Sequence, residues 1–596
     1  MSPASDIDLF APFERDVILE IRTSQMKAMP GLKIQTGIDK KMRTGRIPVS
    51  FAGLDADEHD LVFHGGPDKA IHGYCCTHYT NWQKEFPEAA ARFARGGFGE
   101  NFVTERMNER NVCIGDIVSV GTDGVLLQVS LPRQPCFKLN HRFQLKNFAP
   151  NTFKTSRTGW YYRVLREGSV QAGDEIRLAE RRWPKWTIER VQEYLHRVQD
   201  NAEMNEELAA VADMGDESRK AFEKRVEKLK AKKKRAAAAA NGNSEEVKEK
   251  WRDFKIIERK IETPRITSFT LEAVTPDPDI PAPQMDVGSH VRLKLPNGLL
   301  RSYSIVSGDR NKFELGIALE DQSRGGSAYM HHQAKIGSTL QVGRVTSDIK
   351  PASAASCHVF IAGGIGITAF LSLLEIYQKI HYEAILHYGV REAPTDIPFR
   401  DRIEGLGDIV KVYDRAKGQR MDIKRIFEGL PWNSHVYVCG PTRMMDEAIK
   451  EAKRRGMGED EVHFEAFGAE TGGDPFDVQV FKAPAHAPAG KKTNGLNGMT
   501  GINGTNGVNG KNGTNSVSGG KLLQVGAEET LLEVLRKHFG DDDVPSSCEV
   551  GNCGTCKVTL RSGRVEHRGT ALGDDEKNDA MLSCVSRGIG KIAIEI

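Results

Sequence analysis

Apolar and polar positions repeat with different periods along the chain, and the changes of period mark the expected elements. From residue 359 onward, apolar runs of strand length alternate with helical stretches. The runs are VFIAGGIG (359–366), ILHYGVRE (385–392) and HVYVCGP (435–441). Strands that alternate with helices predict a parallel α/β sheet. The preceding segment, 251–350, has short strand-like runs separated by Gly and Pro turns, which predicts a small β-barrel.

The N-terminal part shows two further patterns. Runs such as NVCIGDIVSVG, GVLLQVS and DEIRLAE indicate short strands and a mostly β fold. From 184 to 232, apolar residues recur at intervals of three and four, which predicts a helical tail. The basic tract at 230–235 is interpreted as a solvated helix end that leads into a linker, in preference to a nuclear localisation signal. IHGYCCTHYTNWQ also predicts a helix, and a structural role is favoured over a redox pair for Cys75 and Cys76.

A Gly- and Asn-rich tract separates two strand-like segments near the C-terminus. PFDVQVF (475–481) precedes it and KLLQVG (521–526) follows it. Glycine recurs at every third residue from 495 to 513, but this stretch contains no proline, so a collagen helix is implausible. We therefore expect an insertion of flexible coil at 483–520 that enlarges a hairpin turn inside one domain, because surface loops tolerate such insertions.

Composition narrows the classes of function. With 596 residues the chain is too long for one core and should form several domains. Lys plus Arg (83) almost balance Asp plus Glu (81), so neither nucleic acid nor an anionic membrane is an expected partner. The N-terminus lacks a signal-peptide layout, and the most apolar stretch, 359–374, is interrupted by glycines and shorter than a membrane span. We expect a soluble, cytoplasmic protein.

The strongest motif is a set of four cysteines near the C-terminus. Cys548, Cys553 and Cys556 have the spacing C-x4-C-x2-C, and Cys584 follows. This is the plant-type arrangement for a [2Fe-2S] cluster, whose iron prefers soft thiolate ligands. Zinc and free thiols are the alternatives, and the 27 residues before the fourth cysteine fit a zinc ribbon poorly.

Two further motifs indicate a flavin and a nicotinamide nucleotide. In RSYS (301–304), the guanidinium can bind phosphate, the aromatic ring can lie against an isoalloxazine, and a hydroxyl can bond the flavin. A glycine turn at 363–366 enters a helix near Thr368, which brings backbone amides to a pyrophosphate. Cys439 ends a strand where ligands bind such sheets, although this residue taken alone favours a buried structural cysteine.

The order of motifs from 251 to 596 resembles the phthalate dioxygenase reductase family: RSYS, RGGS, AGGIGIT, VCGP, HFEAFGA and PSSCEVGNCGTCK. The resemblance implies FMN, with FAD as the alternative, and a β-grasp plant-type ferredoxin domain. It also implies NADH, while NADPH stays open because Arg391 could pair with a 2′-phosphate. A flavin is needed because hydride carries two electrons and the cluster accepts one at a time. The residues implied for flavin and nucleotide are Arg301, Tyr303, Ser304, Arg324, Gly325, Gly326, Ser327, Gly363, Gly364, Gly366, Thr368, Cys439, Gly440 and Pro441.

A second resemblance covers residues 30 to 232. HGGPDKA, GGFGENF and PRQPCFKLN are similar to the MOSC domain, named from the C-terminal part of molybdenum cofactor sulfurase, followed by a three-helix tail. Cys136 has the cationic neighbours Arg133 and Lys138, which favour a thiolate and could bind an anionic phosphate. A buried strand cysteine is the alternative of equal weight from the local sequence. The resemblance implies that Cys136 ligates the molybdenum of a pterin cofactor. The candidates for pterin and phosphate contacts are His64, Lys69, Asn101, Arg133 and Asn140.

The expected architecture is therefore a multidomain chain. It comprises a mostly β MOSC domain (1–183) with a helical tail (184–232), a linker (233–250), an FMN-binding β-barrel (251–350), a parallel-sheet NAD-binding domain (351–474) and a β-grasp ferredoxin domain (475–596). The function hypothesis is a self-sufficient reductase that passes electrons from NADH through flavin and [2Fe-2S] to molybdenum at Cys136 and reduces N-hydroxylated small molecules. Two alternatives stay open. One is a pterin–molybdenum carrier or sulfur-transfer module joined to a reductase, and the other is a reductase that serves a separate oxygenase as its redox partner.

Overall fold

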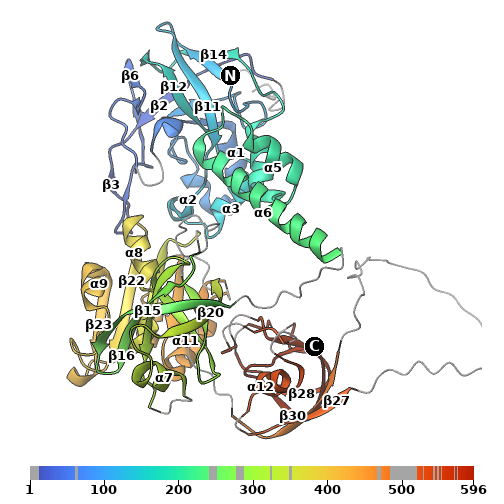
Figure 1. Cartoon of the computed structure of the whole chain (residues 1–596). Coiled ribbons are helices and arrows are strands. Elements are labelled where there is room, and N and C mark those ends of the chain that lie inside the picture. Colours follow the sequence, from blue (N-terminus) through green and yellow to red (C-terminus); the bar gives the residue numbers. More distant parts are fainter. Residues whose placement is uncertain are drawn as a thin grey trace, which may run out of the picture.

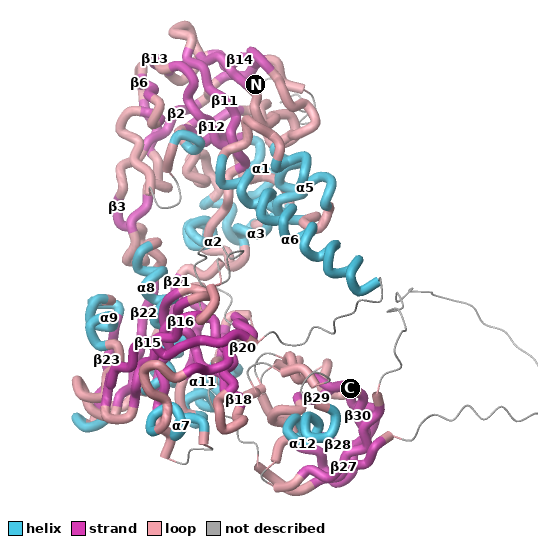
Figure 2. Tube along the Cα trace, in the orientation of Figure 1, coloured by secondary structure: helices cyan, strands magenta, loops and turns pink. Residues whose placement is uncertain are grey.

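The computed structural model places the described elements in four units that follow one another along the chain (Figures 1 and 2). We name them the N-terminal unit (12–240), the barrel unit (251–347), the α/β unit (352–465) and the C-terminal unit (472–596). The residues that the structure describes are 12–60, 65–240, 251–276, 288–321, 325–347, 352, 354–458, 460–465, 472–482, 520–527, 529–540, 544–546, 549–551, 554–569, 571–573 and 575–596.

A mixed sheet forms the centre of the N-terminal unit. Its strands are β1 (Arg15–Val17), β2 (Glu20–Thr23), β5 (Lys41–Arg43), β8 (Ile71–Cys75), β9 (Phe102–Thr104), β10 (Ile117–Val120), β11 (Val125–Pro132), β12 (Trp160–Arg166) and β14 (Glu175–Glu180). The spatial order is β1-β14-β10-β11-β12-β8-β9-β2-β5. Small ladders are made by β3 (Lys27–Ala28) with β4 (Gln35–Thr36), and by β6 (Ile47–Ser50) with β7 (Gly53–Leu54) and β13 (Gly168–Val170). The expected mostly β fold is confirmed.

Apolar cores lie on both faces of this sheet, so its central strands are buried on both sides. All five residues of β8 are buried, and because successive strand residues face opposite ways, Ile71 and Tyr74 belong to different cores. The core around Tyr74 also takes residues from α1 (Thr77–Glu85), α2 (Phe137–Phe143) and α3 (Phe148–Lys154). The helix expected over IHGYCCTHYTNWQ is wrong in its first half: Cys75 ends β8, Cys76 precedes the helix, and α1 begins at Thr77. Burial of this segment between β12 and β9 favours the strand.

The helical tail packs its apolar residues into the core on the other face. It consists of α4 (Ile188–Gln192), a π-helical turn (Glu193–Arg197), α5 (Ala202–Ala209) and α6 (Asp216–Ala240). Val191, Leu208 and Phe222 are buried in this core. The last helix continues into the segment expected as a linker, since the alanines at 236–240 have the highest helix propensity.

The barrel unit is a closed antiparallel barrel, as expected. Its strands are β15 (Arg252–Thr263), β16 (Ile266–Ala273), β17 (Ser289–Lys294), β18 (Leu300–Gly308), β19 (Lys312–Ala318) and β20 (Thr339–Ser347), with α7 (Gly326–His332) between the last two. They close in the order β15-β16-β19-β18-β17-β20. Phe254, Phe269 and Leu293 are among the residues that fill its interior.

The α/β unit has the expected parallel sheet. Its strands are β21 (Cys357–Gly363), β22 (Ala384–Val390), β23 (Val410–Asp414), β24 (Ser434–Cys439) and β25 (Val462–Phe464), in the order β23-β22-β21-β24-β25. The helices are α8 (Leu371–Lys379), α9 (Arg400–Gly405), α10 (Ile423–Glu428) and α11 (Thr442–Arg454). β21 and β24 are buried along almost their whole length, which explains their continuous apolar sequences. Among the described helices of the chain, none is long and apolar enough to cross a membrane.

The C-terminal unit packs a helix against a mixed sheet. Its strands are β26 (Phe476–Phe481), β27 (Lys521–Val525), β28 (Lys557–Glu566), β29 (Ala580–Leu582) and β30 (Arg587–Glu595), in the order β27-β26-β30-β28-β29. The helix α12 (Leu531–Phe539) begins with a capping box formed by Thr530 and Glu533. β26 and β27 pair antiparallel, so the prediction that the Gly/Asn-rich tract joins the two strands of a hairpin is confirmed. The residues of that tract from 483 to 519 lie outside the described part.

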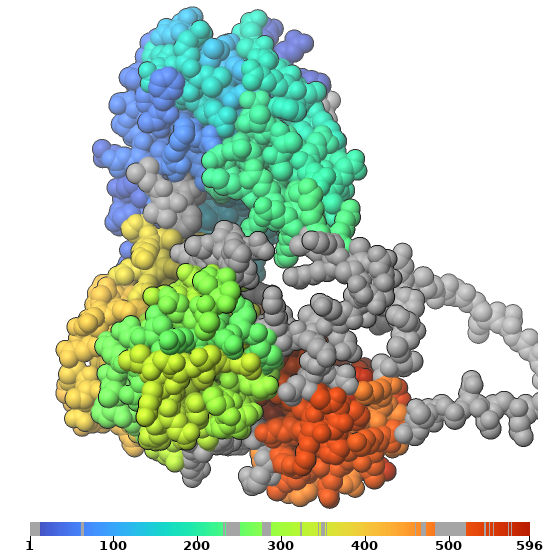
Figure 3. Space-filling model, in the orientation of Figure 1, coloured from blue at the N-terminus to red at the C-terminus, as the bar shows by residue number. Residues whose placement is uncertain are grey.

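The N-terminal unit rests on the α/β unit, while the C-terminal unit lies beside the barrel (Figure 3). The Asn140 side-chain amide donates to the Ala354 carbonyl (2.8 Å), and Lys146 forms an ion pair with Glu461 (2.6 Å). On the other side, the Arg292 guanidinium of the barrel donates to the Ser546 carbonyl of the C-terminal unit (3.2 Å). The chain thus brings the surface next to Cys136 against the α/β unit.

Candidate functional site

Cys136 lies where the sheet of the N-terminal unit gives way to a helix. The strand β11 ends at Pro132, and Cys136 is the residue that precedes α2. The backbone amide of Arg133 donates to the Gly159 carbonyl at the start of β12 (3.0 Å), which fixes the path of the connecting segment. Cys136 is half-buried and forms no disulfide. The alternative of a buried strand cysteine is therefore wrong, because the thiol stands at the edge of a pocket.

This pocket, which we call the inner pocket, gathers polar side chains from several strands and loops. Its lining includes Thr36, Ile38, Lys40, His59, Asp60, His72, Phe98, Asn101, Arg133, Cys136, Lys138 and Tyr161. Arg133 and Asn101 were predicted from the sequence. Lys138 was predicted as a cationic neighbour of Cys136 that could bind phosphate. Lys40, His72 and Tyr161 were not predicted, although the alternation along β12 could have separated Tyr161 from its inward-facing neighbours Trp160 and Tyr162.

The electrostatics of the inner pocket suit an anion. Arg133 is only 3% exposed, and its Nη1 has no hydrogen-bond partner among the described residues. Burial, and next the charge of Arg133, hold the pKa of His72 well below its usual value, so this imidazole is neutral. Lys40 pairs with Asp57, and burial lowers its pKa against the attraction of that carboxylate. A buried guanidinium with an unpaired donor is costly unless a ligand supplies an acceptor.

The other residues predicted for the pterin have contacts within the protein, and only Asn101 among those described also lines the inner pocket. Asn101 bonds within the protein, since its Oδ1 accepts from the His72 amide (2.9 Å) and its Nδ2 donates to Asp57 (2.8 Å). Lys69 forms an ion pair with Glu217 of α6. Asn140 does not line the inner pocket: it accepts from the Ala149 amide (2.6 Å) and donates across to the α/β unit. His64 lies outside the described residues.

A second pocket adjoins the first, and we call it the outer pocket. From the N-terminal unit it is lined by Asp60, Lys69, Gln134, Pro135, Cys136, Phe137, Lys138, Tyr161 and Glu217, and from the α/β unit by Ile380, His381 and Tyr382. Asp60, Cys136, Lys138 and Tyr161 belong to both pockets. Cys136 therefore stands at the junction between a charged cavity and an interdomain cavity.

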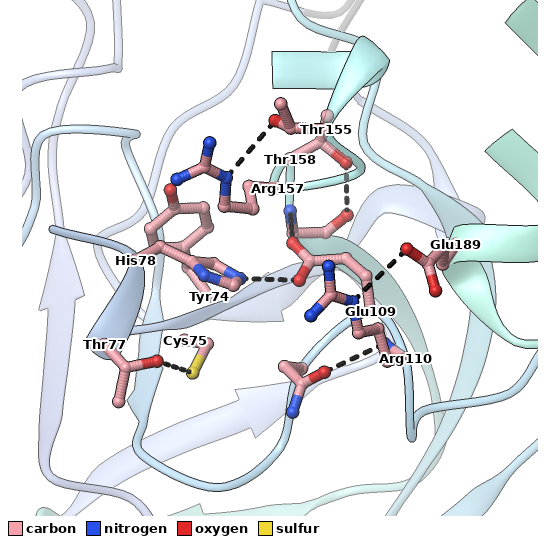
Figure 4. Close-up of polar contacts among 12 residues, drawn as sticks. Tyr74, Cys75, Thr77, His78, Glu109, Arg110, Thr155, Arg157, Thr158 and Glu189 are labelled. Atoms are coloured by element: carbon pink, nitrogen blue, oxygen red, sulfur yellow. Dashed lines mark hydrogen bonds and ion pairs between the residues drawn. The ribbon is translucent and has the colours of Figure 1, made fainter. Parts of the chain in front are cut away.

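A third polar pocket lies around His78 and Glu109 (Figure 4). His78 Nε2 is 2.7 Å from a Glu109 carboxylate oxygen, and the other oxygen accepts from the Gly159 amide (2.6 Å). Burial alone would raise the pKa of Glu109, but the charge and hydrogen bond of His78 outweigh it and lower the pKa. Cys75 contacts the Thr77 hydroxyl (3.0 Å), and burial raises the pKa of its thiol. The pair braces α1 against β12, and the buried thiol supports a structural role for Cys75.

The residues predicted for the flavin lie where the barrel faces the α/β unit. Arg301, Tyr303 and Ser304 belong to β18, and the Ser304 hydroxyl donates to Glu465 at the end of the α/β unit (3.1 Å). A Cβ added to Gly326 would lie 2.6 Å from Arg301 Nε, so α7 can approach this arginine only with glycine there. Gly325 has a left-handed φ of 90° and Ser327 accepts from the Glu320 amide. Arg324 lies outside the described residues.

The residues predicted for the nucleotide meet at the carboxyl ends of β21 and β24. A Cβ on Gly366 would lie 2.3 Å from the Cys439 carbonyl oxygen, and one on Gly363 would lie 2.8 Å from Pro441 Cδ. Gly364 adopts a left-handed φ of 54°, and a Cβ on Gly440 would approach Gly363 N to 3.1 Å. These close approaches leave backbone amides, without side chains, at the edge where parallel sheets bind ligands, which fits a dinucleotide.

Two residues of this region have structural contacts of their own. The Thr368 hydroxyl donates to the Ile365 carbonyl (2.9 Å), and its methyl group packs against β19 of the barrel at Gly316. Cys439 is fully buried, and burial raises the pKa of its thiol well above the usual value. A neutral thiol at this position can pack against a nucleotide but is no nucleophile.

Two of the four predicted cluster ligands are in the described part of the chain. Cys556 and Cys584 are buried, and their sulfur atoms are 3.0 Å apart, which is too long for a disulfide. Gly551 and Gly554 adopt left-handed φ angles of 84° and 74° that let the loop turn tightly beside them. Two convergent thiols in an apolar core fit a metal cluster. Cys548 and Cys553 lie outside the described residues.

Comparison with known proteins agrees with this organisation. The model of the MOSC domain matches residues 60–177, that of the YiiM-like 3-alpha helix domain matches 186–229, and that of the 2Fe-2S iron-sulfur cluster binding domain matches 517–587. A protein of Gibberella moniliformis named "Reductase" is 34% identical over 97% of this chain and 95% of its own length. The heme-dependent oxidative N-demethylase beta subunit of Ectopseudomonas mendocina is 30% identical over 55% of this chain and 93% of its own length.

Among solved structures, phthalate dioxygenase reductase is 28% identical and covers 58% of this chain and 98% of its own, with a TM-score of 0.42. The matched domain models and the relatives together define the class of protein: an oxidoreductase in which a MOSC domain precedes a reductase module that contains a 2Fe-2S iron-sulfur cluster binding domain. The chain belongs to the family of the Gibberella moniliformis reductase, which it matches over nearly its full length.

Proposed function

We propose that this chain is a self-sufficient molybdenum reductase. Electrons would enter from NADH, pass through FMN and the [2Fe-2S] cluster, and leave at molybdenum held by Cys136. The observation that carries the proposal is the position of Cys136, a half-buried thiol at the junction of a cavity lined by the buried Arg133 and a second cavity. A reductase module in the same chain supplies the electrons that such a site needs.

The residues of the inner pocket fit a pterin cofactor with an anionic phosphate. The unpaired Nη1 of Arg133 offers a charge-assisted hydrogen bond, and the Lys138 ammonium stands on the same wall. Neutral His72 can act as a hydrogen-bond partner without adding charge. When bound, the cofactor would supply a metal centre that accepts an oxygen atom from the substrate. The chain's own part is to hold the cofactor with Arg133 and Lys138 and to ligate its metal with the Cys136 thiolate.

The proposed reaction is the reduction of an N-hydroxylated small molecule. NADH, one proton and R–NHOH yield NAD⁺, R–NH₂ and water. The N–O bond breaks, the nitrogen takes up two electrons, and the oxygen leaves as water. The reductase module supplies both electrons from hydride, and the flavin is the point at which they separate into single electrons.

The test is anaerobic NADH oxidation by molybdenum-loaded protein in the presence and absence of benzamidoxime. We expect substrate-dependent turnover in the wild type, and loss of that turnover in Cys136→Ala while NADH still reduces the flavin and the cluster. Cys76→Ala, which changes another half-buried cysteine of the same unit away from either pocket, is the matched control and should turn over normally. If Cys136→Ala loses its molybdenum but keeps full turnover, the proposal is wrong.

A reductase that serves a separate oxygenase is the second candidate. The Ectopseudomonas mendocina relative carries the name of a subunit, and it matches 55% of this chain. In that case no N-hydroxylated compound would drain electrons from the reduced cluster. A stoichiometric complex with an oxygenase that forms equally well in Cys136→Ala would favour this candidate.

A further inference from the structure

We infer that the outer pocket is the substrate-binding pocket and that its far wall, Ile380 to Tyr382, is supplied by the nucleotide-binding unit. This inference rests on the proposed function, because it names where the substrate of the same site binds. The wall lies more than two hundred residues from Cys136 in the chain, in the turn between α8 and β22. Residues of the nucleotide-binding unit would therefore determine which substrate binds next to Cys136.

The two pockets are lined by different kinds of side chain, and this difference indicates which ligand each pocket binds. The inner pocket holds the buried guanidinium of Arg133 with an unpaired donor, and it suits the anionic cofactor. Lys138 and its neighbour Asp60 (3.5 Å) line both pockets and do not distinguish them. The outer pocket lacks the guanidinium of Arg133, and its other cation, Lys69, is paired with Glu217. The remaining wall is largely aromatic and aliphatic. A neutral ligand fits there better than a second anion.

The aromatic wall also indicates the shape of the ligand. The rings of Phe137 and Tyr382 meet edge to face with their centroids 5.1 Å apart, one from each unit. Ile380 and the Tyr161 ring complete this part of the pocket. Such a lining accepts a flat ring by stacking and by edge contacts. The ligand class is therefore an uncharged, planar aromatic compound whose N-hydroxyl group points toward Cys136.

Contacts around the pocket hold the far wall in place. Glu383, which follows the wall, accepts from the backbone amide of Lys33 (2.6 Å), and Tyr382 stacks on His358 inside the α/β unit. The wall residue His381 has a left-handed φ of 54°. Trp432 lies against His141 with a centroid separation of 5.8 Å, and this contact belongs to the same interface but lines neither the inner nor the outer pocket.

The test compares wall residues with an interface residue outside the pocket. Binding of benzamidoxime to the full-length holoprotein is measured by isothermal titration calorimetry, together with KM for its reduction. We expect Tyr382→Leu to raise the dissociation constant about tenfold, because it removes an aromatic wall. His381→Gly should raise it at least threefold, and it is the safer variant because glycine accepts the left-handed backbone without strain. Trp432→Leu should bind within twofold of the wild type.

The outcomes separate this inference from the proposed function. Flavin and iron contents equal to those of the wild type identify variants that are correctly folded. If His381→Gly and Tyr382→Leu bind benzamidoxime as the wild type does while Cys136-dependent reduction continues, the pocket assignment is refuted and the proposed function stands. If the wild type does not bind benzamidoxime, the ligand class is refuted. If binding weakens in the wall variants but no variant or wild type reduces the compound, the pocket stands and the proposed function fails.

Discussion

The buried guanidinium of Arg133 leads to a prediction in which stability and cofactor retention separate. In protein without cofactor, Arg133→Met removes a charge that is 3% exposed and a donor that has no partner among the described residues. The change also removes its hydrogen bond to Tyr161. Arg157→Met is the matched control, because Arg157 is satisfied: it lies 3.6 Å from the Trp82 ring centroid and pairs with both carboxylate oxygens of Glu85.

The magnitudes follow from these contacts. An unpaired buried donor destabilises by about 1–3 kcal/mol, and the lost Tyr161 bond contributes about 1 kcal/mol in the opposite direction. The free energy of unfolding of cofactor-free Arg133→Met should therefore equal or exceed that of the wild type. Arg157→Met loses a cation–π contact and an ion pair, about 2 kcal/mol together, or about 4–8 °C in Tm for a unit of this size. For the cofactor, a lost charge-assisted bond of about 1.5–3 kcal/mol weakens binding about 10- to 150-fold.

The assay uses both proteins in two hosts. Calorimetric unfolding is measured on protein from a host that cannot make the pterin, and molybdenum content on protein from a host that can. We expect Arg133→Met to melt at or above the wild-type temperature and to lose its molybdenum, and Arg157→Met to melt lower and keep it. If Arg133→Met melts as low as Arg157→Met and retains its metal, Arg133 is a structural brace and the reasoning about the inner pocket is refuted.

Three further predictions concern the reductase module and the interface. Gly366→Ala should lower the thermal unfolding temperature of the α/β unit, because the added Cβ would lie 2.3 Å from a carbonyl oxygen. Gly405→Ala is the control, because a Cβ at Gly405 would have no heavy atom within 4 Å. Equal melting of the two variants would contradict this prediction. Cys584→Ser should lose iron while keeping flavin, measured by metal analysis and absorbance, and an unchanged iron content would exclude Cys584 as a ligand. Burial alone would raise the pKa of Glu461, but the hydrogen bond from Lys146 outweighs burial and lowers the pKa below 4.5. The wild type should therefore have a larger free energy of unfolding than Glu461→Gln above pH 4.5. This difference should disappear as the pH falls through the lowered pKa. An advantage that grows on acidification in chemical unfolding would contradict the ion pair.

Much of the fold could be predicted because its signals are local. Apolar runs that end in glycine turns, as at 359–366, predict the parallel sheet. The two strand-like segments that flank the Gly/Asn-rich tract predict the hairpin. One local prediction is wrong at Cys75: the sequence predicts a helix there, whereas the structure has the end of strand β8. Short apolar runs do not distinguish a buried strand from a helix, and burial on both sides of β8 decided it.

The sequence by itself determined which chemistry each segment can carry. Spacing of cysteines and glycines along a short stretch constrains the loop that holds them, because backbone sterics act between near neighbours. Only the tertiary structure decided which segments meet at Cys136. Lys40, His72 and Tyr161 reach the inner pocket from separate parts of the chain, and Ile380 to Tyr382 reach the outer pocket from another unit. Their meeting depends on complementary shape and charge between packed surfaces, which the periodicity of a single segment does not contain.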